Sequence, residues 1–106
     1  MIHVFRTYVA ADGKRAALLE RFKKTTLPLF ASHGIAVTGF WESRDDANVL
    51  AYLCAFETDT QREHAWNAFN TDPQWLAAKA ESERDGPLVA SMTTLVLDPI
   101  AGTVPH

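Results

Sequence analysis

The sequence has a single cysteine in 106 residues, which excludes an internal disulfide framework and a cysteine-based zinc site. Basic residues are not in excess: ten Lys and Arg against thirteen Asp and Glu give a formal net charge of −3, which argues against a nucleic-acid-binding protein. No apolar run approaches the length that crosses a bilayer, and the N-terminus lacks the basic and apolar segments of a signal peptide. We therefore expect a cytoplasmic protein that binds neither nucleic acid nor membrane.

Patterns that bind cofactors and metals are also sparse. The glycines form no phosphate-binding loop, and no Ser, His and Asp can be linked into a catalytic triad. The four histidines, His3, His33, His64 and His106, do not have the spacing of metal ligands. We predict no metal site and no cofactor.

The composition is that of one soluble globular domain spanning residues 1–106. Hydrophobic residues make up 47% of the chain and charged residues 22%. A domain of this size buries roughly 65% of the surface of its unfolded chain, which is enough for a core without covalent staples. We expect only the tail, residues 99–106, to be loosely held.

Four segments are predicted to be strands: residues 2–10, 35–43, 49–57 and 88–98. In the first, alternation places Ile2, Val4, Arg6 and Tyr8 on one face. The segment 49–57 is apolar on both faces, which is typical of a strand in the middle of a covered sheet.

Two helical regions lie between these strands. The first begins at Lys14 and ends at Gly34, and Pro28 should kink it or split it after about Leu27. The second should begin at the capping box of residues 60–63, restart at residues 72–73 and stop at residues 86–87.

The order of elements predicts an α+β fold, a ferredoxin-like βαββαβ sandwich with an antiparallel four-stranded sheet and two helices on one face. The other face of the sheet would still carry large apolar side chains, which a monomer would have to expose. We therefore expect a homodimer in which two sheets face each other and form a dimeric α+β barrel.

Several short motifs follow one another along the chain: Phe5-Arg6-Thr7-Tyr8, Leu27-Pro28-Leu29, His33-Gly34-Ile35, Gly39-Phe40-Trp41, Ala65-Trp66 and Asp72-Pro73. In this order and spacing they resemble the NIPSNAP family over roughly Ile2 to Leu97. The resemblance implies the same dimeric α+β barrel. The wider group includes cofactor-free monooxygenases, haem-degrading and chlorite-decomposing haem enzymes, and members with no established activity, so the resemblance implies a fold rather than one reaction.

Arg6 and Tyr8 share one face of a central strand, so the guanidinium should be partly buried. A buried cation without a partner costs several kcal/mol, so Arg6 must meet a carboxylate, carbonyl groups or a bound anion. In the functional interpretation, Arg6 and Tyr8 recognise a carboxylate or an enolate. In the structural interpretation, which the frequency of interior Arg–acid pairs favours, Arg6 forms an ion pair with an acid of the sheet or a helix, for example Glu42 or Glu57.

The remaining candidates each have a structural alternative. His33 is either a general base or haem ligand facing the interior, or a last-turn histidine that donates to helix carbonyls, which we prefer. Trp41, Tyr52 and Trp66, together with Trp75, either line a pocket for a flat aromatic molecule or belong to the core, which is the commoner role.

Three further residues are not assigned a role in binding. We expect Cys54 to be buried and inert, His64 to be exposed, and His3 to lie on the face opposite Arg6, where it could meet its two-fold mate.

We predict that each protomer of the dimer binds a small hydrophobic or aromatic molecule in a cavity between the sheet and the helices. The candidate ligand-binding residues are Arg6, Tyr8, His33, Trp41, Tyr52 and Trp66. An enzyme of this kind would carry out cofactor-independent oxygenation or isomerisation of an activated carbon acid. The alternatives are a non-catalytic dimeric interaction module and, third, a haem-binding protein.

Overall fold

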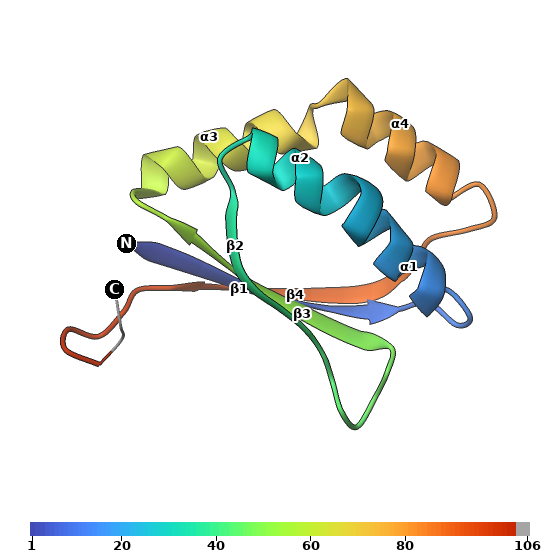
Figure 1. Ribbon diagram of the computed structural model, residues 1–106, viewed down its shortest axis with the longest axis horizontal. Coiled ribbons are helices and arrows are strands. Elements are labelled where there is room, and N and C mark those ends of the chain that lie inside the picture. The colour runs from blue at the N-terminus through green and yellow to red at the C-terminus, as the bar shows by residue number, and fades with distance from the viewer. Residues whose placement is uncertain (104–106) are drawn as a thin grey trace.

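The computed structural model describes residues 1–103 and consists of one sheet with helices packed on one of its sides (Figure 1). The elements, in chain order, are β1 (Ile2–Ala10), α1 (Arg15–Arg21), the π-helical η1 (Phe22–Thr26), α2 (Leu27–Ser32), β2 (Ala36–Glu42), β3 (Val49–Phe56), α3 (Asp59–Asn70), α4 (Pro73–Ser82) and β4 (Val89–Leu97). The strands are ordered β2-β3-β1-β4 and all pairs are antiparallel. This confirms the predicted ferredoxin-like α+β fold.

The register of the sheet decides which side chains reach the helices. Arg6 on β1 pairs with Tyr52 on β3 and with Thr94 on β4. Because directly paired residues share a face, Val4, Arg6 and Tyr8 lie on the helix-covered side together with Tyr52. The central strand β1 therefore brings a guanidinium and a phenol under the helices, as its alternation predicts.

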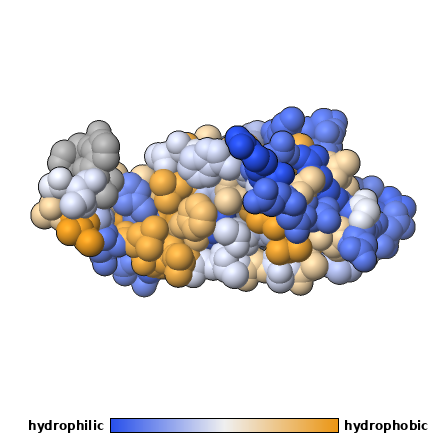
Figure 2. Space-filling model, turned by 90° about the horizontal axis from the view of Figure 1, so that it is seen from below, coloured by the Kyte–Doolittle hydropathy of each residue, from blue (hydrophilic) through white to orange (hydrophobic). Residues whose placement is uncertain are grey.

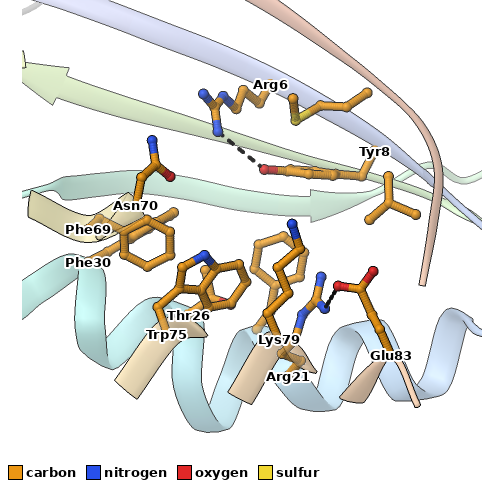
Figure 3. Close-up of a pocket in the computed structure, with 13 residues that line it drawn as sticks. Arg6, Tyr8, Arg21, Thr26, Phe30, Phe69, Asn70, Trp75, Lys79 and Glu83 are labelled. Carbon is orange, nitrogen blue, oxygen red and sulfur yellow. Dashed lines mark hydrogen bonds and ion pairs between the residues drawn. The ribbon is translucent and has the colours of Figure 1, made fainter. Parts of the chain in front are cut away.

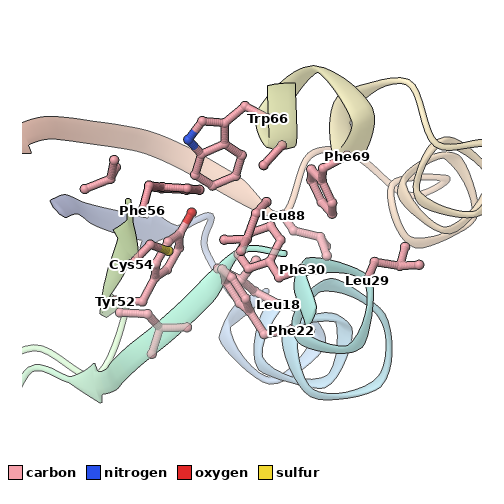
Figure 4. Packing of buried hydrophobic residues seen from close by; sticks show 14 of the residues in the cluster. Leu18, Phe22, Leu29, Phe30, Tyr52, Cys54, Phe56, Trp66, Phe69 and Leu88 are labelled. Atoms are coloured by element: carbon pink, nitrogen blue, oxygen red, sulfur yellow. The ribbon is translucent and has the colours of Figure 1, made fainter. Parts of the chain in front are cut away.

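The core lies between the sheet and the helices and is dominated by aromatic rings (Figure 4). Tyr52 and Phe30 are fully buried, and their ring centroids are 5.7 Å apart in an edge-on arrangement. Phe30 also contacts Phe69 and Trp66 edge-on, with centroids 4.7 and 5.3 Å away. Edge-to-face aromatic pairs stabilise a core beyond the area that they bury. Residues of the first helical region, β3 and α3 are thereby held in one cluster.

Pro28 widens the first helix rather than breaking it. The Leu27 N–H donates to the Phe22 carbonyl, five residues back, so the turn before the proline is π-helical. Pro28 then occupies the first turn of α2, where a missing N–H costs little. The predicted split near Leu27 is therefore a change of helix type. The predicted cap is confirmed, because Gly34 has a φ of 75°.

The second helical region begins at Asp59, one residue before the predicted capping box. Thr58 is the N-cap of α3, and its side chain accepts a hydrogen bond of 3.0 Å from the Gln61 N–H. Gln61 in turn accepts from the backbone N–H of Glu57 at 2.7 Å. The prediction of a start at Thr60 is wrong because Thr58 supplies the cap, and the Gln61 side chain reaches back to the Glu57 N–H just before it. The restart is confirmed, since Asp72 caps α4 and accepts from the Gln74 N–H at 2.8 Å.

The face of the sheet remote from the helices is open and carries apolar groups, seen as orange areas in Figure 2. Trp41 on β2 and Leu95 on β4 are 51% and 57% exposed. The Trp41 indole lies across Gly39, where an added Cβ would collide with the ring. Gly39 is therefore the residue that lets the indole lie flat on this face.

Candidate functional site

A cavity of about 340 Å³ lies between the sheet and the helices (Figure 3). Its walls come from β1 and β4 on the sheet side and from the end of α1, η1, α2, the end of α3 and α4 on the helix side. The volume is at the lower end of the range for small-molecule pockets. The lining residues are Arg6, Tyr8, Arg21, Phe22, Thr26, Phe30, Phe69, Asn70, Trp75, Lys79, Glu83, Val89 and Met92.

Arg6 is held by aromatic residues rather than by an acid. One terminal nitrogen of the guanidinium donates to the Tyr52 hydroxyl at 3.3 Å and to the Tyr8 hydroxyl at 3.5 Å. The guanidinium carbon lies 4.2 Å from the centre of a Trp66 ring, in a cation–π contact. Its Nε is buried and has no hydrogen-bond partner among residues 1–103. The side chain therefore keeps donor capacity that the described protein groups do not use.

The predicted ion pair of Arg6 with Glu42 or Glu57 is not formed. Glu42 instead makes an ion pair with Arg15. Glu57 is exposed, and within the described part of the chain no carboxylate lies within ion-pair distance of Arg6. The structural interpretation of Arg6 was wrong because both acids lie away from the interior, at the exposed ends of their strands.

The two tyrosines beside Arg6 form one hydroxyl cluster. Their oxygens are 3.1 Å apart, and their rings are stacked with centroids 5.7 Å apart. Burial, and then the proximity of Tyr8, raise the pKa of the Tyr52 hydroxyl well above its ordinary value. Burial opposes the charge on Arg6, but the two tyrosines outweigh it and raise the pKa of the guanidinium. At neutral pH Arg6 is therefore a permanent cation beside the protonated Tyr52 phenol.

A second arginine in the cavity is already neutralised. The Arg21 guanidinium donates to Glu83 at 3.2 Å and to the Ser82 hydroxyl at 3.0 Å, and it lies 5.1 Å from the centre of a Trp75 ring. Its side chain is only 9% exposed. This pair fastens the end of α1 to the end of α4 and forms one rim of the cavity.

Most of the remaining wall is apolar and aromatic, with Thr26, Asn70 and Lys79 as its polar members. Phe69 and Trp75 lie with centroids 4.8 Å apart, and Phe22 contacts Tyr8 edge-on at 5.3 Å. Met92 and Val89 close the side next to β4. A flat apolar group placed here would contact rings on several sides, while its polar end could reach Arg6.

The predicted site residues are only partly brought together. Arg6 and Tyr8 line the cavity, whereas Tyr52 and Trp66 are buried behind them and hold Arg6 in place. Trp41 lies on the open face of the sheet, away from the cavity.

His33 also lies outside the cavity lining. Its Nε2 is 2.7 Å from the Asp72 carboxylate, so the ring ties the end of α2 to the N-cap of α4. This contact is neither of the predicted ones, because the ring nitrogen meets a carboxylate instead of the interior or a helix carbonyl. The hydrogen bond from His33 lowers the pKa of Asp72.

Cys54, His3 and His64 lie outside the cavity lining. Cys54 is buried, and burial raises its pKa to about 12, so the thiol is inert as predicted. His64 is exposed, and His3 lies on the open face of the sheet. His106 and the last residues of the tail lie outside the described residues. Within residues 1–103 no three His, Cys, Asp or Glu side chains are grouped as a metal site. Over the same residues no helix is long and apolar enough to cross a membrane.

Sequence reasoning missed the contribution of α4. Trp75 is predicted either to line a pocket or to belong to the core, and it does line the cavity. Glu83 is predicted only as part of a solvated helix end, and Lys79 is given no role. The three residues follow one another at intervals of four, so they lie on one face of a helix. That spacing was the available signal, but the pattern does not say which part of the sheet this face opposes.

Comparison with known proteins gives a family and a fold. The NIPSNAP family model matches residues 3–102. A search of curated proteins finds no match. An uncharacterized NIPSNAP domain protein from Burkholderia xenovorans has a similar structure, with a TM-score of 0.84 at 20% identity over 100% of both chains.

Two further solved structures extend this likeness. A NIPSNAP family protein with unknown function from Agrobacterium tumefaciens gives a TM-score of 0.81 at 22% identity, covering 97% of this chain and 91% of that one. A protein from Nitrosomonas europaea, named as an antibiotic biosynthesis monooxygenase, gives 0.69 at 13% identity, covering 94% of this chain and 99% of that one. At these identities the structures establish the fold alone.

Proposed function

This chain belongs to the NIPSNAP family, and from that premise and the geometry of its cavity we propose that it binds a small organic acid with an apolar or aromatic body. The carboxylate, or an enolate of the same charge, would meet Arg6 and Tyr8. The observation that carries the proposal is a buried cation at a cavity wall with no carboxylate partner among the described residues.

The proposal that the ligand carries an anionic end follows from the energetics of Arg6. A buried cation without an anion is costly, and cation–π contact and two phenol hydroxyls offset only part of that cost. A carboxylate in the cavity would form charge-assisted hydrogen bonds with the unused guanidinium donors. Tyr8, already within 3.5 Å of Arg6, would donate to the same group.

The proposal that the rest of the ligand is apolar follows from the other residues that line the cavity. Phe22, Phe30, Phe69 and Trp75 present rings, and Met92 adds a flexible side chain. Mostly apolar walls with a few convergent polar groups are typical of small-molecule sites. A ligand with one or two rings fits this combination of volume and lining.

The same arrangement supports chemistry on an activated carbon acid. A fixed cation and a phenol in a water-poor cavity would stabilise the enolate that isomerisation and cofactor-independent oxygenation both pass through. The Nitrosomonas europaea protein named as a monooxygenase shares the fold, which makes such chemistry the first to test. Haem binding is not favoured, because His33, the predicted haem ligand, is engaged by Asp72.

Calorimetric titration with a panel of aromatic acids tests the binding. We expect Arg6→Leu to weaken binding by about ten- to a hundredfold, the usual range for hydrogen bonds to a charged group. The unfolding free energy should stay the same or rise, because an unpaired buried cation is removed. Unchanged affinity with raised stability would leave Arg6 a packing role only and would favour the non-catalytic module.

We also propose that two copies associate through the open face of the sheet. The chain exposes 6751 Å², whereas a folded monomer of 11.8 kDa typically exposes about 5900 Å². The excess of about 800 Å² is close to what each partner buries in a standard interface. The radius of gyration is 14.4 Å, whereas a compact domain of this length has about 13 Å. The larger value reflects the flat shape of the single chain. A second copy of the chain would cover this face and complete a barrel. The cytoplasmic location of the protein stays a prediction.

Sedimentation at micromolar concentration tests the association. We expect a species of twice the protomer mass, and we expect Leu95→Glu, which puts a charge on the open face, to give monomers. The control is Leu76→Glu, because Leu76 is similarly exposed, at 51%, but lies on α4. A wild-type protein that stays monomeric would contradict the proposal.

A further inference from the structure

Two positive charges in the cavity remain without an acid partner in the described part of the chain. The lining contains three cations, Arg6, Arg21 and Lys79, and one acid, Glu83. Glu83 pairs with Arg21 at 3.2 Å, which leaves Arg6 and Lys79. The whole chain has a net charge of −3, so this excess of positive charge is local to the cavity.

The two cations enter the cavity from different layers of the fold. Arg6 is fixed on the central strand by Tyr52, Tyr8 and Trp66. Lys79 belongs to α4, and Figure 3 shows its side chain extending from that helix toward Tyr8. The aromatic wall of the cavity lies beside both. A bound molecule would therefore meet a rigid cation on the sheet side and a flexible, more solvated cation on the helix side.

We propose that the cavity takes a dianion, an apolar or aromatic dicarboxylate that spans from Arg6 to Lys79. This inference rests on the proposed function and names the substrate class more narrowly. The first carboxylate binds Arg6 and Tyr8. The second binds the Lys79 ammonium near the mouth, so that the filled cavity carries no uncompensated charge.

The contribution of Lys79 should be smaller than that of Arg6. Lys79 is exposed, and an ion pair in contact with water is worth up to about 1 kcal/mol, which is about fivefold in affinity. Salt should weaken this part of the binding more than the part due to Arg6.

The test compares benzoate with benzene dicarboxylates and biphenyl dicarboxylates of different carboxylate spacing, by calorimetric titration. We expect at least one diacid to bind wild-type protein about fivefold more tightly than benzoate, beyond the factor of two due to two equivalent carboxylates. The additional gain should vanish in Lys79→Met. It should persist in Lys23→Met, which makes the same charge change at an exposed residue outside the cavity lining.

The outcomes separate this inference from the proposed function. Two results would contradict the dianion proposal but leave the proposed acid site intact. In the first, benzoate binds in an Arg6-dependent way but no diacid binds more tightly than benzoate. In the second, the higher affinity for the diacid persists in Lys79→Met. If neither monoacid nor diacid binds, both are wrong.

Discussion

At the scale of single residues, the informative feature is a charge placed where an apolar side chain would pack more favourably. Arg6 sits on a covered sheet face between Val4 and Tyr8, and the described residues give it phenols and an indole but no acid. Replacing a buried charge by an apolar residue of similar size is often neutral or stabilising. The presence of arginine at this position therefore supports the proposed anion site.

Tyr8→Phe separates the role of the phenol from that of the ring. The edge-on contact of the ring with Phe22 is kept, while the hydroxyl near Arg6 is lost. We expect affinity for aromatic acids to fall by about three- to tenfold, as for one neutral hydrogen bond. Calorimetry measures this loss. Equal affinity of variant and wild type would remove Tyr8 from the site.

Cys54 provides a pH-dependent prediction. Burial raises its pKa to about 12, whereas an unfolded cysteine titrates near 8.5. The neutral thiol therefore favours the folded state fully below about pH 8.5, and this contribution is lost as the pH rises toward 12. At pH 8 we expect the native thiol to be unreactive toward a colorimetric disulfide reagent and to react once the protein unfolds. Rapid reaction of native protein would contradict the buried position.

At the scale of elements, local signals predict most of the fold. Alternation in residues 2–10 predicts the face that carries Arg6, and the apolar run 49–57 predicts a central strand. Gly34 and Asp72 predict helix ends because their chemistry satisfies backbone groups locally. The start of α3 was misplaced because threonines at 58 and 60 both offer a cap, and only the position of Gln61 in space distinguishes them.

The two threonines give a matched pair of substitutions. Thr58→Ala removes the side-chain acceptor for the Gln61 N–H, so we expect the free energy of unfolding to fall by about 1 kcal/mol. Thr60→Ala, inside the helix and exposed, should change it little or raise it slightly. Urea denaturation measures both. A larger loss in Thr60→Ala would restore the capping box at residues 60–63.

The contact between α2 and α4 is expected to be sensitive to acid. His33 lowers the pKa of Asp72, so the stabilising contribution is complete above about pH 4 and is lost as the pH falls through the lowered value. Asp72→Asn keeps an N-cap acceptor but removes the charge. In thermal melts between pH 2 and 5, we expect the variant to show a shallower loss of stability than wild type. Parallel curves would mean that this pair does not contribute.

At the scale of the whole molecule, the site arises where separately predictable elements meet. Arg6 and Tyr8 could be predicted because strand alternation is local. The facing residues Lys79 and Glu83 could not, since their position depends on how α4 is set against the sheet. Tertiary packing such as the Arg21–Glu83 pair fixes that arrangement. Trp41 is predicted as a pocket residue, but the pairing of β2 with β3 places Gly39 and Trp41 on the open face of the sheet. That pairing register, like the position of α4, cannot be read from local sequence.

A crystal structure of the protein with the tightest-binding aromatic acid tests the proposed acid site most directly. We predict that the carboxylate lies within hydrogen-bond distance of the Arg6 guanidinium and the Tyr8 hydroxyl, with the ring against Phe69 and Trp75. An acid found elsewhere on the surface, with the cavity filled by rearranged side chains, would contradict it.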